Sequence, residues 1–188
     1  MKQFPTLMIL CLILIACNAT NKENEAHINK KKDSKPIISQ TFFKYDNIDY
    51  YFNDFDESAI GDLIDNQHDS EIDSFKMGII IGEIPIDISD LTFISNLKAI
   101  GYNKHELNKS KFKNIDSIFR EKSSNEDAIS RCIHIYRDLL IFKKLNKVTG
   151  TAKVCFTCKA HQINGTKANT SNFGRNGDYD RLQKLLRN

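Results

Sequence analysis

Four segments of the chain carry apolar residues at intervals of three or four, the spacing of an amphipathic helix. These segments are residues 56–66, 87–100, 112–119 and 178–187. Gly101 follows the second of them, at the position where a glycine commonly ends a helix. In the last segment Tyr179, Leu182 and Leu186 fall on one face. The pattern therefore predicts four helices.

Two stretches in the first half of the chain have the composition of β-strands. Residues 42–55 are rich in aromatic side chains and carry a turn signal at Asp46-Asn47, which predicts a first hairpin. Residues 77–84 read MGIIIGEI, a short apolar run typical of a buried strand. We therefore expect both strands and helices in this half.

The clearest strand pattern lies on either side of Leu145-Asn146. A two-residue loop at that point pairs Lys144 with Lys147, so that the numbers of paired residues sum to 291. This register gathers the apolar residues of both strands on one face. The shared face then holds Ile133, Ile135, Leu139, Ile141, Val148, Ala152, Val154 and Phe156.

The same register assigns positions to three charged side chains. Asp138 lies opposite Lys153 on the less apolar face, where the two form a cross-strand pair. Arg137 points to the apolar face, and a guanidinium there needs a partner. We therefore expect Arg137 to be a buried charge that links the C-terminal strands to the first half of the domain.

Residues 161–166 are expected to add a third strand to this hairpin. The predicted fold class is α+β, a single small domain with a C-terminal antiparallel β-meander flanked by helices. Residues 37–188 make up this domain, and 152 residues are enough for one hydrophobic core. Before it, residues 18–36 are polar without a hydrophobic period and are typical of a disordered tether.

The 188 residues carry a formal net charge of +3, which does not indicate a nucleic-acid-binding protein. The charge is unevenly distributed along the chain. Residues 37–128 hold 9 Lys and Arg against 18 Asp and Glu, and residues 129–188 hold 12 against 3. Such blocks indicate solvated faces, two halves that complement each other in the fold, or a patch that recognises a charged protein partner.

The first 17 residues begin with a short basic region and continue with nine apolar residues, 7–15. A small residue, Ala16, precedes Cys17, and these are the features of a secretory signal peptide. The last four residues, Leu14-Ile15-Ala16-Cys17, resemble the lipobox of bacterial lipoproteins. The apolar run is too short to span a bilayer as a helix, which needs about 20 residues.

This resemblance implies that residues 1–16 are a signal peptide and that Cys17, diacylated on sulfur, becomes the first residue. Residues 17–36 then form the lipidated cysteine and tether, followed by the domain at 37–188. Asn18 follows the cysteine, and in the lipoproteins that the motif resembles a residue other than Asp there favours the outer membrane. We therefore expect a protein anchored in the bacterial envelope, facing the periplasm from the outer membrane.

Three cysteines remain for the folded domain once Cys17 is acylated, namely Cys132, Cys155 and Cys158. In an oxidising compartment at most one disulfide forms among three thiols. Its members are either Cys132 and Cys158, which the predicted register brings side by side, or Cys155 and Cys158. Unpaired thiols buried in the core are the alternative.

A metal site is a third interpretation of the same residues. Cys155 and Cys158 form a CxxC motif, which His161 extends to CxxCxxH. With Cys132 as a third ligand and His134 or His161 as the fourth, the set would make a Cys3His zinc site. A catalytic redox pair fits less well, because such a thiol belongs at a helix N-terminus and this motif ends a strand.

The sequence contains no G-x-S-x-G, no H-E-x-x-H and no P-loop. Only Cys132 and His134, two apart on one strand, suggest nucleophilic chemistry. We therefore expect a lipid-anchored, non-catalytic binding module without a cofactor, one version being an immunity-type protein that neutralises a toxin delivered to the periplasm. The alternative is a metal- or thiol-dependent envelope protein that uses the cluster Cys132, Cys155, Cys158 and His161.

Overall fold

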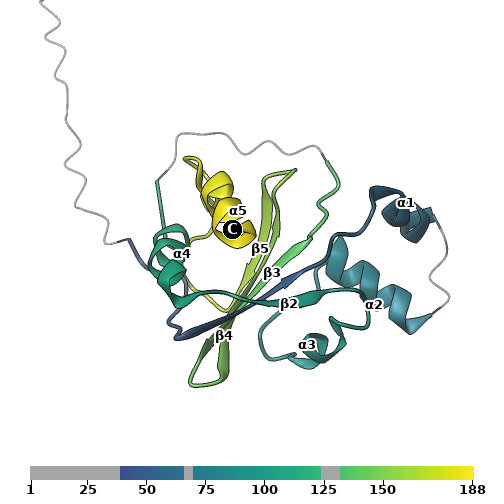
Figure 1. Cartoon of the computed structure of the whole chain (residues 1–188), viewed down its shortest axis with the longest axis horizontal. Coiled ribbons are helices and arrows are strands. Elements are labelled where there is room, and N and C mark those ends of the chain that lie inside the picture. Colours follow the sequence, from purple (N-terminus) through teal and green to yellow (C-terminus); the bar gives the residue numbers. More distant parts are fainter. Residues whose placement is uncertain (1–38, 66–69, 124–131) are drawn as a thin grey trace, which may run out of the picture. The chain divides into compact units, whose positions relative to one another are not determined.

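A five-stranded antiparallel sheet with the strand order β2-β1-β3-β4-β5 organises the structure (Figure 1). The computed structural model describes residues 39–65, 70–123 and 132–188, all within one unit, Ile38–Asn188. The strands are β1 (Asn47–Phe52), β2 (Asn103–Glu106), β3 (Asp138–Lys144), β4 (Lys147–Cys155) and β5 (Ala160–Asn164). Because β3, β4 and β5 are neighbours in both sequence and space, they form the predicted meander.

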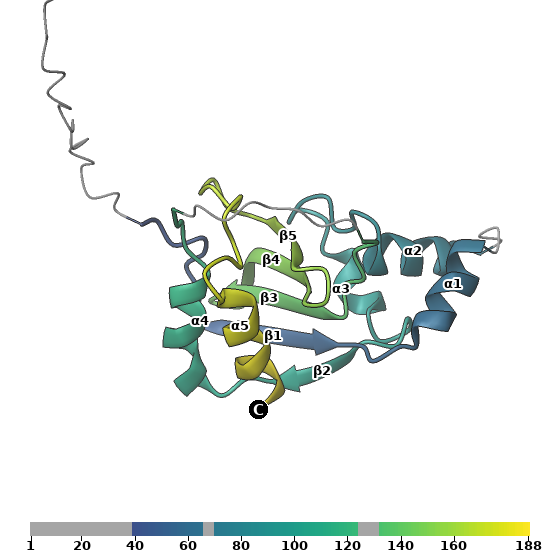
Figure 2. The same cartoon turned by 90° about the horizontal axis from the view of Figure 1, so that it is seen from above.

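Helices cover both faces of this sheet (Figures 1 and 2). The helices are α1 (Glu57–Asp65), α2 (Glu71–Ile80), α3 (Thr92–Asn96), α4 (Phe112–Ile118) and α5 (Asp178–Arg187), and a 3-10 turn, η1 (Lys109–Lys111), precedes α4. The first three lie on one face, and α4 and α5 lie on the other. The α+β class is therefore confirmed.

Each face of the sheet supports its own hydrophobic core, and β3 contributes to both. Leu139 and Ile141 pack with the residues of α1, α2 and α3. Leu140 and Phe142 pack with the residues of α4 and α5. Because side chains alternate along a strand, a β3 with apolar residues at four successive positions is buried on both sides.

Three predicted helices, α1, α4 and α5, form with nearly the expected bounds. The predicted helix at 87–100 is shorter, since α3 covers only its middle. Asp87 and Asp90 each accept a backbone N–H from two residues further on, at 2.6 and 3.0 Å. These local bonds compete with helical ones and delay the start of the helix. Gly101 ends the segment with φ of +95°, as expected.

Of the two strand predictions in the first half, that for residues 42–55 is confirmed only in part, since they contain β1 but no hairpin, and that for residues 77–84 is wrong. Residues 42–55 do not fold back as a hairpin, because β1 is one strand between β2 and β3. The carboxylate of Asp46 instead accepts the backbone N–H of Leu145 at 2.9 Å, in the turn of another hairpin. The apolar run at 77–84 begins inside α2, whose N-terminus is capped by Ser70. A short continuous apolar run lacks the periodicity that would distinguish a helix from a strand.

The β3–β4 hairpin has the predicted turn, but its register changes after two pairs. Lys144 pairs with Lys147 and Lys143 with Val148, as expected, whereas Phe142 pairs with Gly150. Thr149 is therefore an extra residue on β4, and its Oγ1 donates to the carbonyl of Phe142 at 3.3 Å. One extra residue in one strand is a β-bulge.

This bulge reverses the predicted faces of β4. The expected pair of Asp138 with Lys153 is wrong, because Leu139 lies opposite Lys153 and Asp138 lies opposite Val154. Both charged residues are buried, with 2% of each exposed, and they point to opposite faces of the sheet. Asp138, and not Arg137, therefore lies on the same face of the sheet as Val154, the face covered by α4 and α5.

Gly150 is the position at which this arrangement is most easily tested. The ring of Phe43 lies directly over it, so a methyl group there would overlap the ring. We expect Gly150→Ala to lower the free energy of unfolding in urea by about 1–3 kcal/mol, the usual cost of overpacking a core. The matched control is Gly61→Ala in α1, where an added methyl group meets no neighbour. That change should stabilise the protein by about 0.5–1 kcal/mol. A Gly150→Ala variant as stable as the native protein would contradict the packing.

Candidate functional site

A disulfide joins Cys132, just before β3, to Cys158 in the turn after β4. The two Cα atoms are 6.1 Å apart, within the usual range for a disulfide. This is one of the two pairings that the sequence allows. The bond holds the segment that enters β3 against the β4–β5 turn, where Lys159 has φ of +49°.

Cys155 is a free thiol and is buried. It packs with Tyr136 and Ala160 in a small apolar cluster, next to Cys158. His134 is half-buried, and its ring centroid lies 6.3 Å from that of Tyr136. Cys155 is therefore packed as a small apolar side chain.

His161 lies on the opposite face of the sheet from Cys155, because it pairs with Val154 in the β4–β5 ladder. Its Nδ1 is 2.8 Å from the hydroxyl oxygen of Tyr179, and its ring packs 4.9 Å from the ring of Phe173. Burial lowers the pKa of His161 to about 4, although a hydrogen bond with the backbone of Thr170 acts in the other direction. The imidazole is therefore neutral at neutral pH.

These positions separate the ligands of the suggested zinc site. Cys132 and Cys158 are bonded to each other, and zinc binds cysteine as the thiolate. Cys155 and His161 lie on opposite faces of the sheet. Among residues 39–65, 70–123 and 132–188, no three His, Cys, Asp or Glu side chains form a group that could hold a metal ion.

Lys153 is a buried cation on the face of β4 opposite to the one that the sequence pattern predicts. Its ammonium nitrogen donates to the carbonyls of Ile79 at 3.0 Å and Gly82 at 2.7 Å, at the C-terminal end of α2. It also lies 4.6 Å from the centroid of the Tyr136 ring. Burial lowers the pKa of Lys153 to about 7, while the charge of Glu83 acts in the other direction. Lys153 therefore joins β4 to α2.

Asp138 occupies the equivalent buried position on the α5 side of the sheet. The hydroxyl of Tyr50 donates to it at 2.6 Å, and Nη2 of Arg187 lies 3.0 Å away. The guanidinium of Arg187 also stacks 3.6 Å from the ring centroid of Phe52. Burial raises the pKa of Asp138 above its ordinary value, and the hydrogen bond from Tyr50 and the charge of Arg187 offset only part of this. This residue links α5 to β1 and β3.

Arg137, the expected buried link, is half-buried beside the core. Its guanidinium lies 5.0 Å from the ring centroid of Phe55, and Nη2 donates to the Phe55 carbonyl at 3.4 Å. Phe55 belongs to the acidic half of the sequence. Arg137 therefore contacts the other half through an aromatic ring and a carbonyl.

Six carboxylates from the acidic half of the sequence lie at exposed or half-buried positions on α1, on α2 and in the loop that follows them. We define the acidic surface as Asp62, Asp65, Glu71, Asp73, Asp87 and Asp90. In the described part of the chain none of these six carboxylates makes an ion pair. Asp49 differs, because it is buried and pairs with Lys104 at 2.8 Å and with Lys143. Ion pairing between the two halves of the sequence therefore does not reach the acidic surface within the described residues.

Two cavities flank α4 on the opposite side of the sheet, and both are rich in cations. The first, of about 370 Å³, lies between α4 and α5 and has as its charged side chains Lys111, Arg181 and Lys184. The second, of about 460 Å³, contains Lys44, Lys113, Lys144 and one acid, Asp116. Figure 1 shows α4 and α5, beside which these cations lie, on the other side of the sheet from α1 and α2. Lys111 of η1 and Lys113 of α4 lie in the acidic half of the sequence, so the net charge of that half does not reveal them.

Comparisons of the chain with protein-family models, with curated proteins and with solved structures found no match. Cys17 and the expected signal residues, 1–16, lie outside the described residues. Within the described residues, the helices are too short or too polar for any of them to cross a bilayer.

The disulfide should contribute measurably to the free energy of unfolding. Removing it in a Cys132→Ser/Cys158→Ser variant should lower the free energy of unfolding by about 3 kcal/mol, as expected for a loop of this size. The two cysteines are 26 positions apart. The native protein in a reducing agent should lose the same amount, whereas the double variant should be insensitive to the agent. Equal stability of the native protein with and without reductant would contradict this assignment.

The burial of Lys153 should make the free energy of unfolding depend on pH. Its pKa falls from 10.5 to about 7 on folding, so between these values the unfolded chain binds more protons. The free energy of unfolding should therefore rise with pH from 7 to 9, by at most about 1.4 kcal/mol per pH unit. Lys153→Met should remove this slope, and Lys159→Met, at an exposed position, should retain it. Urea titrations at several pH values measure both, and equal slopes in the two variants would refute the prediction.

Proposed function

We propose that this protein is a lipoprotein of the bacterial envelope whose folded unit binds another protein without catalysis. The observation that carries the proposal is the acidic surface, whose six carboxylates make no ion pair within the described residues. Asp73, Asp87 and Asp90 accept hydrogen bonds only from residues close in sequence, and like charges that gather on neighbouring segments repel one another. They favour association with a basic surface.

The chemistry of the partner follows from this charge. A basic protein surface would be attracted at long range and would displace water from Asp62, Asp65 and their neighbours on contact. Complementary charge of this kind speeds association and disfavours wrong partners. An immunity-type protein, which must bind a toxin on its arrival in the periplasm, is one concrete version of the proposal.

The first 36 residues support a membrane anchor. The resemblance of Leu14-Ile15-Ala16-Cys17 to the lipobox supports acylation at Cys17, and two or more acyl chains hold a protein stably on a membrane. The polar residues 18–36 would act as a flexible tether with a typical reach of about 25 Å. Such a tether leaves the domain free to meet a partner near the membrane.

The alternative is a thiol- or metal-dependent envelope protein. It would need the disulfide of Cys132 and Cys158 to be reduced before these sulfurs could bind a metal. The buried thiol of Cys155 would be the remaining sulfur ligand. The unpaired acidic surface has no role in this alternative, and for that reason we place the binding module first.

One experiment in the native host tests both parts of the proposal. The native protein should be recovered with the membranes and should carry acyl groups by intact mass, whereas Cys17→Ser should be recovered in the soluble fraction. Chemical crosslinking of the native protein should capture a partner with a basic surface. Asp62→Lys/Asp65→Lys should reduce its recovery by about tenfold or more, because charge steering is lost.

The matched control is Glu106→Lys/Asp180→Lys, which changes the net charge equally at two exposed residues outside the acidic surface. It should recover the partner as well as the native protein does. Equal loss in both double variants would assign binding to net charge alone and refute the role of the acidic surface. Recovery of Cys17→Ser with the membranes, like that of the native protein, would refute the anchor.

A further inference from the structure

The cavity between α4 and α5 has the side chains of an anion-binding site. Its volume is about 370 Å³, in the range of small-molecule sites. Its lining consists of three cations, two amides and one apolar side chain, with no acidic side chain: Lys111, Asn114, Arg181, Lys184, Leu185 and Asn188. Of the two cavities beside α4, this is the one without a carboxylate side chain.

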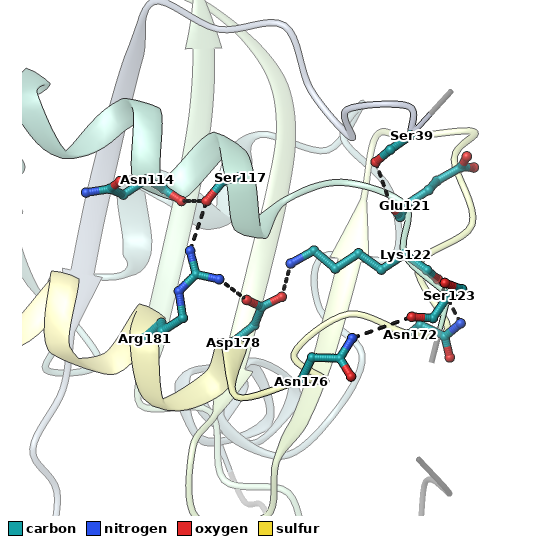
Figure 3. Close-up of polar contacts among 10 residues, drawn as sticks. All are labelled: Ser39, Asn114, Ser117, Glu121, Lys122, Ser123, Asn172, Asn176, Asp178 and Arg181. Carbon is teal, nitrogen blue, oxygen red and sulfur yellow. Dashed lines mark hydrogen bonds and ion pairs between the residues drawn. The ribbon is translucent and has the colours of Figure 1, made fainter. Parts of the chain in front are cut away.

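Arg181, which lines this cavity, is held in a fixed orientation by the two hydrogen bonds drawn in Figure 3. Its Nη1 donates to Asp178 at 2.7 Å and its Nη2 donates to the hydroxyl of Ser117 at 3.1 Å. The hydroxyl of Ser117 in turn donates to the carbonyl of Asn114 at 2.6 Å. A guanidinium has five N–H donors, and these two bonds leave three. The side chain is about half exposed, so the remaining donors are open to a ligand.

The acid that orients Arg181 does not cancel the positive charge of the cavity. Asp178 is almost fully buried, and it also pairs with Lys122 (Figure 3). One carboxylate therefore faces two cations, and this group retains one positive charge. Lys111 and Lys184 add to it, and neither side chain makes a hydrogen bond or ion pair within the described part of the chain.

The other side of α4 extends the same electrostatic field. The second cavity carries Lys44, Lys113 and Lys144 on its lining, against Asp116. Asp116 is already paired with Arg120 at 3.5 Å. An anion that approaches α4 therefore meets positive charge on both sides of the helix. Such a field raises the local concentration of anions.

We propose that the cavity between α4 and α5 binds a phosphate group. The planar donors of Arg181 match the oxygens of a phosphate, and Lys111 and Lys184 supply point charges beside it. The half-buried side chain of Leu185 offers an apolar wall to the group that the phosphate esterifies. Two molecules could supply the phosphate group, an anionic phospholipid headgroup at a membrane or a free phosphate in solution. The inference rests on the proposed function only for the first of these sources.

Binding is measured on the protein carrying Cys17→Ser, so that no acyl chain contributes. One probe is a vesicle of phosphatidylglycerol and phosphatidylcholine, with phosphatidylcholine alone as its reference. The other probe is inorganic phosphate, followed through the amide signals of α4 and α5 by NMR. We compare Lys111→Gln/Lys184→Gln with Lys98→Gln/Lys159→Gln, which has the same net charge, and thermal unfolding verifies that each variant folds.

We expect Lys111→Gln/Lys184→Gln to bind the anionic vesicles about 30-fold more weakly than the protein that keeps both lysines. The control pair should weaken binding by less than about threefold, because distant exposed charges are screened. Binding of the protein to the anionic vesicles identifies a lipid headgroup as the source of the phosphate group. A response to inorganic phosphate without vesicle binding identifies a soluble phosphate. Either result, with loss in the first variant only, supports the site.

Equal weakening in both variants would assign binding to net charge or to the tether and overturn the proposal. The absence of a response to both probes would overturn it as well. Neither result bears on the acidic surface or on acylation of Cys17, which the crosslinking experiment tests separately. Failure of the phosphate site and failure of the proposed function are therefore distinguishable.

Discussion

The β-bulge at Thr149 is the constraint on which the rest of this structure depends. Without the extra residue, Ala152 and Val154 would face the α1–α3 layer, and Lys153 would face the core formed with α4 and α5. The bulge moves β4 by one residue against β3. Each face of the sheet then receives side chains that its helices can cover, and Gly150 leaves room for the ring of Phe43. Since a slip of one residue exchanges the two faces of a strand, this single position decides the composition of both cores.

As a consequence of the bulge, two charged residues, Lys153 and Asp138, lie buried on opposite faces of the sheet. Lys153 satisfies carbonyls at the C-terminal end of α2, where a cation also interacts favourably with the helix dipole. Asp138 takes a hydrogen bond from Tyr50 and an ion pair from Arg187 of α5. Buried charges are costly unless they are paired. Both therefore fix the position of a helix on the sheet, since another position would leave the charge without its partner.

The sheet that these contacts hold together also separates the charges of the molecule. Carboxylates without ion pairs in the described part gather over α1 and α2, and cations gather around α4 and α5. The acidic surface and the phosphate cavity would therefore act in opposite directions. A domain held to an anionic membrane through α4 and α5 would present Asp62 and Asp65 away from it, towards a basic partner. In this view the disulfide of Cys132 and Cys158 stabilises the fold and takes no part in binding.

The sequence by itself determined those features that depend on neighbours along the chain. The helical spacing at α1, α4 and α5, the turn at Leu145-Asn146 and the class of the fold are of this kind, because a helical period and a tight turn are local. The pairing of Cys132 with Cys158 was one of two open choices. Only the tertiary structure decided that 77–84 starts within a helix, that β1 is a central strand and that Lys153 is buried. The cavity at Lys111 and Arg181 also depends on the tertiary structure, since it forms where α4 and α5, far apart in sequence, pack together. Burial, strand pairing and cavities depend on contacts between distant segments, which no local pattern records.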